Sequence, residues 1–122
     1  DVYKRQLLCL TTHDVEQSPQ LAIAMMDAIT ARLRQAESML ALLGLRRVEE
    51  RVRGFLTLLA QDYGQNCDEG LRLNLRLTHQ EMASALSTTR VTVTRVIGLL
   101  RDEGWLKIDH QRHLVITHLP KR

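Results

Sequence analysis

Aromatic residues, cysteines and prolines are all scarce in this chain of 122 residues. Aromatic side chains make up 3% of the sequence, and there are two cysteines and two prolines, whereas hydrophobic residues reach 44%. A core with so few aromatic rings must be built from Leu, Val, Ile, Ala and Met, which suits helices packed on helices. The length allows one compact domain with one long accessory element.

Motifs for metal binding or catalysis are also missing. Cys9 and Cys67 are far apart and neither belongs to a CxxC pair, so we expect no local zinc or iron–sulfur site. His110 and His113 are close in sequence but have no accompanying ligand pattern, and we predict no metal. Because no Gly-rich phosphate loop, HExxH motif or nucleophile–base set is present, we expect a protein that is not an enzyme.

The remaining absences concern localisation and charge. The sequence contains no apolar run of about 18 residues, the length needed to cross a membrane. The sparse cysteines are typical of a reducing cytoplasm. The net charge is only +3, a weak argument for nucleic acid. However, 14 of the 17 basic residues are arginines, the side chain that contacts phosphate and guanine through two hydrogen bonds. GC-rich coding produces the same bias, so the arginines give mild support.

Residues 1–17 look like the edge of a fragment, or the remnant of a preceding domain. Asp1–Gln6 contain neither an initiating Met nor the apolar segment of a signal peptide. We exclude them from the fold prediction and expect the protein to be part of a longer one.

A long helix is predicted over residues 18–44. Ser18 and Pro19 suit its start, and Gly44 breaks the pattern and is a candidate hinge. Apolar residues recur at alternating spacings of three and four for about three heptads, which favours pairing with the same helix of a second copy. The alternative is an amphipathic helix packed on its own core. The predicted dimer seam is Met26, Ile29, Leu33, Ala36, Leu40 and Leu43.

Residues 45–122 are predicted to form a second domain of mixed structure. A helix from Arg46 to Tyr63 is followed by a polar loop with Cys67, and the alternation in Leu71–Leu77 predicts a strand whose four leucines point inward. Thr78 and Glu81 form a capping box that opens a short helix over 79–86.

A second helix follows after the turn at 87–89 and ends before Gly104, and strands at 105–109 and 113–117 are expected to form a hairpin. This order is that of a winged helix-turn-helix. The predicted fold class is therefore mainly α with a small β component, a long dimerisation helix preceding a winged helix-turn-helix domain.

The second helix has two unlike faces at about 100° per residue. One arc is wholly apolar: Val93, Val96, Ile97 and Leu100. The other carries Arg90, Val91, Thr94, Arg95 and Gly98. Arginine pairs with guanine and valine meets a thymine methyl, so this arc favours reading DNA in the major groove, with the Thr94 hydroxyl on the DNA backbone. A solvated basic face is the alternative for the helix taken alone.

The run from Thr78 to Arg95, Thr-His-Gln-Glu-Met-Ala-Ser-Ala-Leu-Ser-Thr-Thr-Arg-Val-Thr-Val-Thr-Arg, resembles the DNA-binding signature of the cyclic-AMP receptor and fumarate–nitrate reduction regulator (Crp-Fnr) superfamily. The run over residues 89–95 and the preceding Gly-Leu-Arg-Leu-Asn-Leu-Arg-Leu strand over 70–77 are most similar to its cyanobacterial global nitrogen regulator branch. The resemblance implies base contacts by Arg90, Val91 and Arg95, and backbone contacts by Thr78, Gln80, Thr89 and Thr92. Many members carry Glu where this chain has Val91, which cannot accept a hydrogen bond from cytosine. We therefore expect a half-site nearer GTA than GTGA.

The same resemblance implies partners and an effector. Double-stranded DNA, a second copy of the chain, RNA polymerase and a coactivator protein are the expected partners. An N-terminal β-barrel sensor would precede these residues, and this stretch itself would hold no cofactor. Arg32 and Glu37 match positions that help bind 2-oxoglutarate in the nitrogen regulators, the alternative being an exposed charged pair.

Two functions remain open from the sequence. The first is an effector-controlled, dimeric, sequence-specific transcription regulator, and the second is a winged helix that serves as a protein-interaction module. A protein-docking face would expose Leu, Phe or Met rather than the arginines and threonines of helix 88–103. The sequence therefore favours DNA.

Overall fold

The computed structural model describes residues 11–119, and the expectations about Asp1–Gln6 and Cys9 concern residues outside this range. The chain divides into two compact units, with the boundary between Ser38 and Met39. Each unit is described by itself.

The first unit contains a short helix that the sequence analysis did not expect. Helix α1 spans Thr12–Gln17, and its N-cap Thr11 forms a capping box with Asp14. Helix α2 spans Pro19–Leu43 and runs on into the second unit. The Ser18 hydroxyl accepts a hydrogen bond from the Leu21 N–H at 3.2 Å, which satisfies one free donor of the first turn. The predicted start and end of the long helix are thus confirmed.

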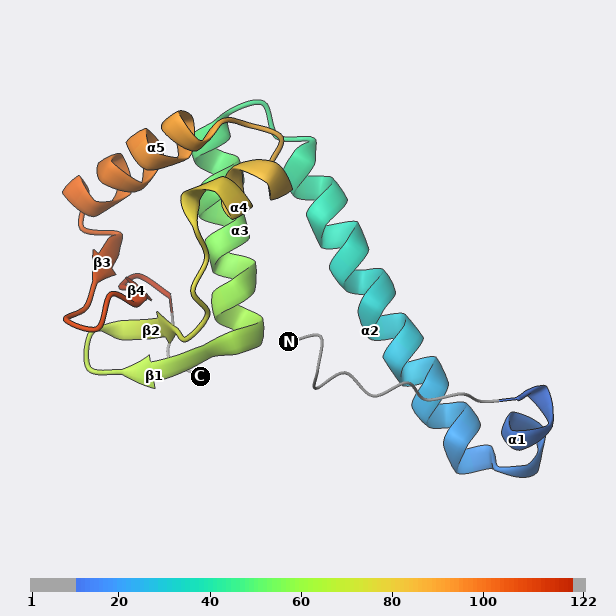
Figure 1. Cartoon of the computed structure of the whole chain (residues 1–122). Helices are drawn as coiled ribbons and strands as arrows, with labels where there is room; N and C mark the ends of the chain where they lie inside the picture. The colour runs from blue at the N-terminus through green and yellow to red at the C-terminus, as the bar shows by residue number, and fades with distance from the viewer. Residues whose placement is uncertain (1–10, 120–122) are drawn as a thin grey trace. The chain divides into compact units, whose positions relative to one another are not determined.

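Helix α3, Val48–Tyr63, is central to the core of the second unit. Val52, Leu56 and Ala60 lie fully buried on one of its faces. A four-stranded sheet begins directly at its C-terminal end (Figure 1). Helices α4, His79–Ala85, and α5, Arg90–Asp102, contribute Met82, Leu86 and the apolar arc of α5 to the same core.

The sheet is antiparallel throughout and has the order β1-β2-β4-β3. Its strands are β1 (Gly64–Cys67), β2 (Gly70–Leu73), β3 (Leu106–Ile108) and β4 (Leu114–Ile116). The hairpin of β3 and β4 confirms the predicted wing. Ile116 of β4 stands opposite both Leu71 and Leu106, so β4 joins the two hairpins into one sheet.

Two predictions around β2 are wrong. The segment with Cys67 is not a loop but strand β1, which pairs residue by residue with β2. The predicted strand over 71–77 ends at Leu73, and Leu75 is 41% exposed instead of pointing inward, although Leu77 still packs against the core. The strand ends early because β2 pairs with β4 only through Leu71 and Arg72, so the next residues have no partner strand there.

Candidate nucleic-acid interface

Helices α4 and α5 form a helix-turn-helix whose start and turn are fixed by short polar contacts. The Thr78 hydroxyl accepts from the Glu81 N–H at 3.0 Å, and the Glu81 carboxylate accepts from the Thr78 N–H at 3.2 Å. This is the predicted capping box. In the turn, Ser87 takes a φ of 55°, a left-handed conformation that reverses the chain tightly between the helices. The two helices also pack against each other through apolar side chains.

Helix α5 has the two faces that its sequence predicts. Val93, Val96, Ile97 and Leu100 are buried, whereas Arg90 and Arg95 are exposed and Val91 is 71% exposed. Within residues 11–119 neither arginine side chain takes part in a hydrogen bond or an ion pair. These guanidinium groups therefore keep all their donors for an external partner. The structure brings the three predicted base-contacting residues together on one exposed face.

The predicted backbone-contacting residues surround the start of each helix. Thr89 caps α5 by accepting from the Thr92 N–H at 3.2 Å, and the two threonine hydroxyls are 2.8 Å apart. Because one hydroxyl donates to the other, one hydroxyl hydrogen of this pair stays available. The Thr78 hydroxyl acts only as an acceptor here and keeps its own hydrogen. Gln80 contacts Ser84 at 3.3 Å, which leaves its amide oxygen and one N–H unused.

Thr94 differs from the other threonines. Its hydroxyl donates to the Arg90 carbonyl oxygen at 3.0 Å and lies 2.7 Å from Nδ1 of His79 in α4. The predicted contact between this hydroxyl and the DNA backbone stays a prediction. The link to His79 was not predicted, since the two residues are fifteen positions apart.

The wing tip is organised by Asp109. Its Oδ1 accepts hydrogen bonds from the backbone N–H groups of Gln111 (2.9 Å) and His113 (2.8 Å), and Arg112 takes a φ of 64°. The hydrogen bond from the His113 N–H is the main cause that lowers the pKa of Asp109 below its usual value. The turn therefore depends on an ionised carboxylate.

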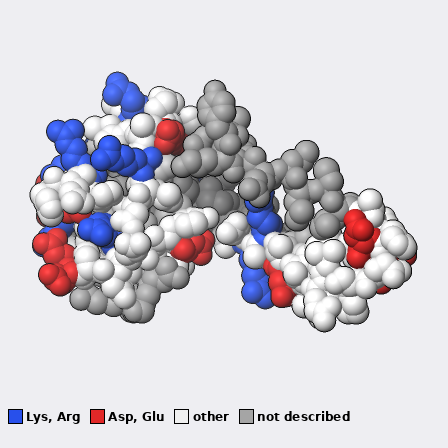
Figure 2. Space-filling model, turned by 60° about the horizontal axis from the view of Figure 1, so that its bottom comes forward, with Lys and Arg blue, Asp and Glu red and all other residues white. Residues whose placement is uncertain are grey.

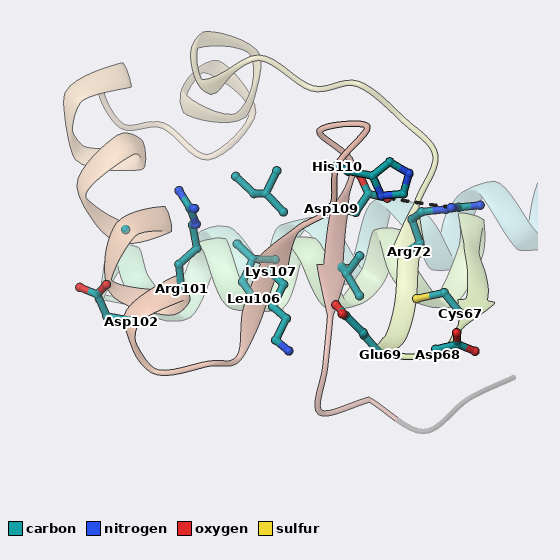
Figure 3. Close-up of a pocket in the computed structure, with 13 residues that line it drawn as sticks. Cys67, Asp68, Glu69, Arg72, Arg101, Asp102, Leu106, Lys107, Asp109 and His110 are labelled. Carbon is teal, nitrogen blue, oxygen red and sulfur yellow. Dashed lines mark ion pairs between the residues drawn. The ribbon is translucent and has the colours of Figure 1, made fainter.

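A groove of about 800 Å³ continues the exposed face of α5 towards the sheet. Figure 3 shows Arg101 of α5 on one side of this groove and Arg72 of β2, paired with Asp109, on the other, with Lys107 between them. Asp68, Glu69 and Asp102 also line the groove, so its charge is mixed. Gly98 lies at its edge, where an added Cβ would meet no atom within 4 Å.

A smaller cavity of about 460 Å³ lies between the segment after β2, the start of α4 and the wing. Arg76, His79 and Arg112 line it together with apolar side chains. Arg76 belongs to the predicted strand over 71–77, where the alternation puts it on the face opposite the leucines. Figure 2 shows the Lys and Arg side chains in the left-hand part of the view mainly towards the top, with several Asp and Glu lower down.

Arg53 ties α3 to the end of α5. Its guanidinium donates to Glu49 at 2.9 Å and to Glu103 at 2.6 Å, and it lies 5.0 Å from the centroid of the Trp105 ring. The hydrogen bond to Glu103 is the main cause that raises the pKa of Arg53. This contact links α3 to the residue that follows α5, and sequence reasoning missed it because the partners come from distant segments.

Helix α2 leaves most of the predicted dimer seam exposed. The exposed fractions are 67% for Met26, 62% for Ile29, 58% for Leu33 and 69% for Leu40. Ala36 is also exposed, and Leu43 is partly covered at 38%. Arg32 and Glu37 are exposed on the same helix, and within the described range neither forms an ion pair.

Residues 11–119 contain neither a candidate metal site nor a candidate membrane span. No group of three His, Cys, Asp or Glu residues in this part of the chain could hold a metal ion. None of the helices in the described range is both long and apolar enough to cross a membrane.

A capped short helix, a tight turn, a second helix with a basic exposed face and a β-hairpin define a winged helix-turn-helix of the DNA-binding regulator class. The family model for the Crp-like helix-turn-helix domain matches residues 50–121. The chain therefore belongs to the Crp-like helix-turn-helix family.

Individual relatives agree with this assignment. The global nitrogen regulator of Nostoc sp. is 35% identical over 119 residues, covering 94% of this chain and 52% of the relative. That of Synechocystis sp. is 34% identical over 119 residues, with the same coverage of 94% and 52%. A CooA variant from Carboxydothermus hydrogenoformans superposes with a TM-score of 0.75 at 28% identity, covering 86% of this chain and 48% of that structure.

The chain spans about half the length of the curated relatives it matches. The predicted resemblance, the mainly helical winged fold and the regulator class, as opposed to an enzyme, are confirmed by these matches.

Proposed function

We propose that this chain is a sequence-specific DNA-binding transcription regulator that reads the major groove with α5. One observation carries the proposal: Arg90, Val91 and Arg95 share an exposed face of a capped helix, and both guanidinium groups are unpaired within the described chain. Arginine on guanine and valine on a thymine methyl are pairings that distinguish base pairs. A protein-docking face would instead present bulky apolar groups.

Replacing Arg90 with alanine tests this directly. Binding to a palindromic duplex with GTA and TAC half-sites about one helical turn apart should weaken by about 1–3 kcal/mol. Binding to a scrambled duplex should change little, because phosphate contacts carry the non-specific part. Arg46→Ala is the matched control, since Arg46 is exposed but lies between α2 and α3, outside the helix-turn-helix. Equal losses on both duplexes would reduce Arg90 to a phosphate contact.

We further propose that α2 forms a dimer with the α2 helix of a second copy, residues 18–44 acting as the pairing element and residues 45–122 as the reading domain. An exposed apolar stripe of this length marks an interaction surface, and its heptad spacing suits a second helix. Leu33→Glu should convert a dimer into a monomer in sedimentation experiments. Gln35→Glu adds the same charge on a face of α2 away from the stripe and should leave the dimer intact. If the Leu33→Glu variant is still a dimer, the proposed seam is not the dimer interface.

Nitrogen-responsive control is the finer proposal, and it rests on the relatives named as global nitrogen regulators. In it, 2-oxoglutarate is the effector, and Arg32 of α2 grips one of its carboxylates with Glu37 close by. RNA polymerase and a coactivator protein would be further partners. If α2 suffices for binding, 2-oxoglutarate should change the DNA affinity of this chain, and Arg32→Ala should abolish the change. No effect on the wild-type chain would show that Arg32 and Glu37 alone do not form the site.

A further inference from the structure

We propose that His79 is a positioning residue for the reading helix. Its Nδ1–H donates to the Thr94 hydroxyl and thereby fixes the first turn of α5, which carries Arg90, against α4. This inference rests on the proposed function, because the helix it positions is the one assigned to DNA reading. It differs from a DNA contact, because His79 and Thr94 act here through each other and through the backbone of Arg90.

The direction of the His79–Thr94 hydrogen bond follows from counting hydrogens. The Thr94 hydroxyl has one hydrogen, and it is donated to the Arg90 carbonyl oxygen at 3.0 Å. The 2.7 Å contact between Thr94 Oγ1 and His79 Nδ1 therefore needs its hydrogen from the ring. With the hydroxyl hydrogen on the Arg90 carbonyl oxygen, His79 carries a proton on Nδ1, in the neutral ring as in the charged one.

This arrangement occupies the group through which Thr94 would contact a phosphate. A phosphate oxygen can only accept a hydrogen bond, and the single hydroxyl hydrogen of Thr94 already goes to Arg90. Thr78 offers the contrast, since its hydroxyl accepts from the Glu81 N–H and keeps its hydrogen free. We therefore assign Thr94 to holding α5 in place, and leave Thr78 as a candidate for the phosphate.

The link matters because the other contacts between α4 and α5 are apolar. Met82 and Ala83 of α4 belong to the same buried core as Val93 and Val96 of α5, and such packing has no directional preference. A hydrogen bond from the first residue of α4 to the second turn of α5 sets the rotation of α5 more strictly. Bidentate base contacts demand that precision, whereas phosphate contacts tolerate small shifts.

The test compares replacements that remove the hydrogen-bonding group with replacements that keep one, at both ends of the bond. His79→Ala and Thr94→Val remove the donor and the acceptor, whereas His79→Asn and Thr94→Ser keep an N–H and a hydroxyl in place. The net value of one hydrogen bond corresponds to about a 2- to 12-fold loss of affinity for the GTA/TAC duplex. We expect that loss in each removing variant and no further loss in their double variant, while the conservative variants and all binding to scrambled DNA stay within about twofold of wild type.

Several results would overturn the proposal. Additive losses in the double variant, or equal losses on scrambled DNA, would show that the pair does not act as one positioning unit. A loss with Thr94→Val but none with His79→Ala would make Thr94 a direct DNA contact. If the wild-type chain discriminates between duplexes and His79→Ala discriminates equally well, this inference fails while the proposed function stands. If the wild-type chain binds both duplexes equally well, both this inference and the proposed function fail.

A measurement without DNA checks the same bond. Nitrogen-15 NMR of the His79 ring should show the proton on Nδ1 in the neutral form, because Thr94 needs that donor. The Thr94→Val variant should lose this preference. A neutral ring with its proton on Nε2 in the wild-type chain would contradict the proposed direction of the His79–Thr94 hydrogen bond.

Discussion

Replacing either of two helical glycines with alanine should affect the stability of the chain, but not in the same direction. Gly54 lies in α3 and Gly98 in α5, and neither has a positive φ, so neither needs glycine for its backbone. A Cβ added at Gly98 would meet nothing within 4 Å. A Cβ added at Gly54 would come 2.3 Å from Cδ2 of Leu42, the buried side chain near the end of α2. The difference between the two sites is therefore packing alone.

Gly98→Ala should stabilise the chain by about 0.5–1 kcal/mol, because alanine loses less backbone freedom in a helix. For a domain of this size that corresponds to a rise of about 2–8 °C in Tm. Gly54→Ala makes the same gain, but overpacking costs about 1–3 kcal/mol. The cost should lie at the low end, since the obstructing atom is the end of a flexible leucine. We expect Gly98→Ala to be more stable than wild type, and Gly54→Ala to be equal to it or less stable.

Thermal and urea unfolding, followed by circular dichroism, measure both variants. A destabilised Gly98→Ala would refute the reasoning, because it would mean that the face of α5 at Gly98 is covered in the folded protein. The same variant is informative on DNA. If the backbone of α5 comes close to the duplex at Gly98, the more stable variant should bind more weakly, and unchanged binding would place the duplex farther from this turn.

The remaining predictions concern charged contacts. Arg53→Met should lower the free energy of unfolding by about 1–2 kcal/mol at low salt and by less at high salt, because it removes the ion pair with Glu103 and the contact with Trp105. Urea titrations at both salt concentrations measure this difference. An equal loss at both would leave only packing as the cause. Asp109→Ala should raise the hydrogen-exchange rate of the His113 amide, whereas Asp109→Asn, which keeps an acceptor oxygen, should raise it less. Because the hydrogen bond from the His113 N–H lowers the pKa of Asp109, the stabilisation of the wing is fully present above the ordinary aspartate pKa of 3.8 and is lost as the pH falls through the lower pKa of the folded state. Protection that survives well below pH 3.8 would contradict the role of the carboxylate.

The parts of the fold that depend on local pattern could be predicted from sequence. The capping box at Thr78, the apolar arc of α5 and the end of α5 near Gly104 all follow from residues within a few positions of each other. The helical pattern put Arg90 and Arg95 on one outward face, and the family resemblance implied base contacts for the same two residues. The two unlike faces that the pattern predicted for α5 are the ones observed.

The parts that depend on distant partners could not be predicted. Leu75 continues a perfect alternation, yet it is exposed because β4 pairs only with Leu71 and Arg72 of β2. Strand β1 consists of polar residues and exists because β2 pairs with it, so its composition suggested a loop. The His79–Thr94 link likewise needs the helix-turn-helix to be folded before the two side chains meet.

A competition experiment addresses the proposal that the exposed face of α5 reads a DNA sequence. The wild-type chain would be bound to a labelled duplex with GTA and TAC half-sites at one fixed, moderate salt concentration. Unlabelled GTA/TAC, TGTGA-type and scrambled duplexes would then compete. We expect the GTA/TAC duplex to compete best, since Val91 cannot accept a hydrogen bond from cytosine. A scrambled duplex that competes equally well at every salt concentration tried would contradict sequence reading by α5.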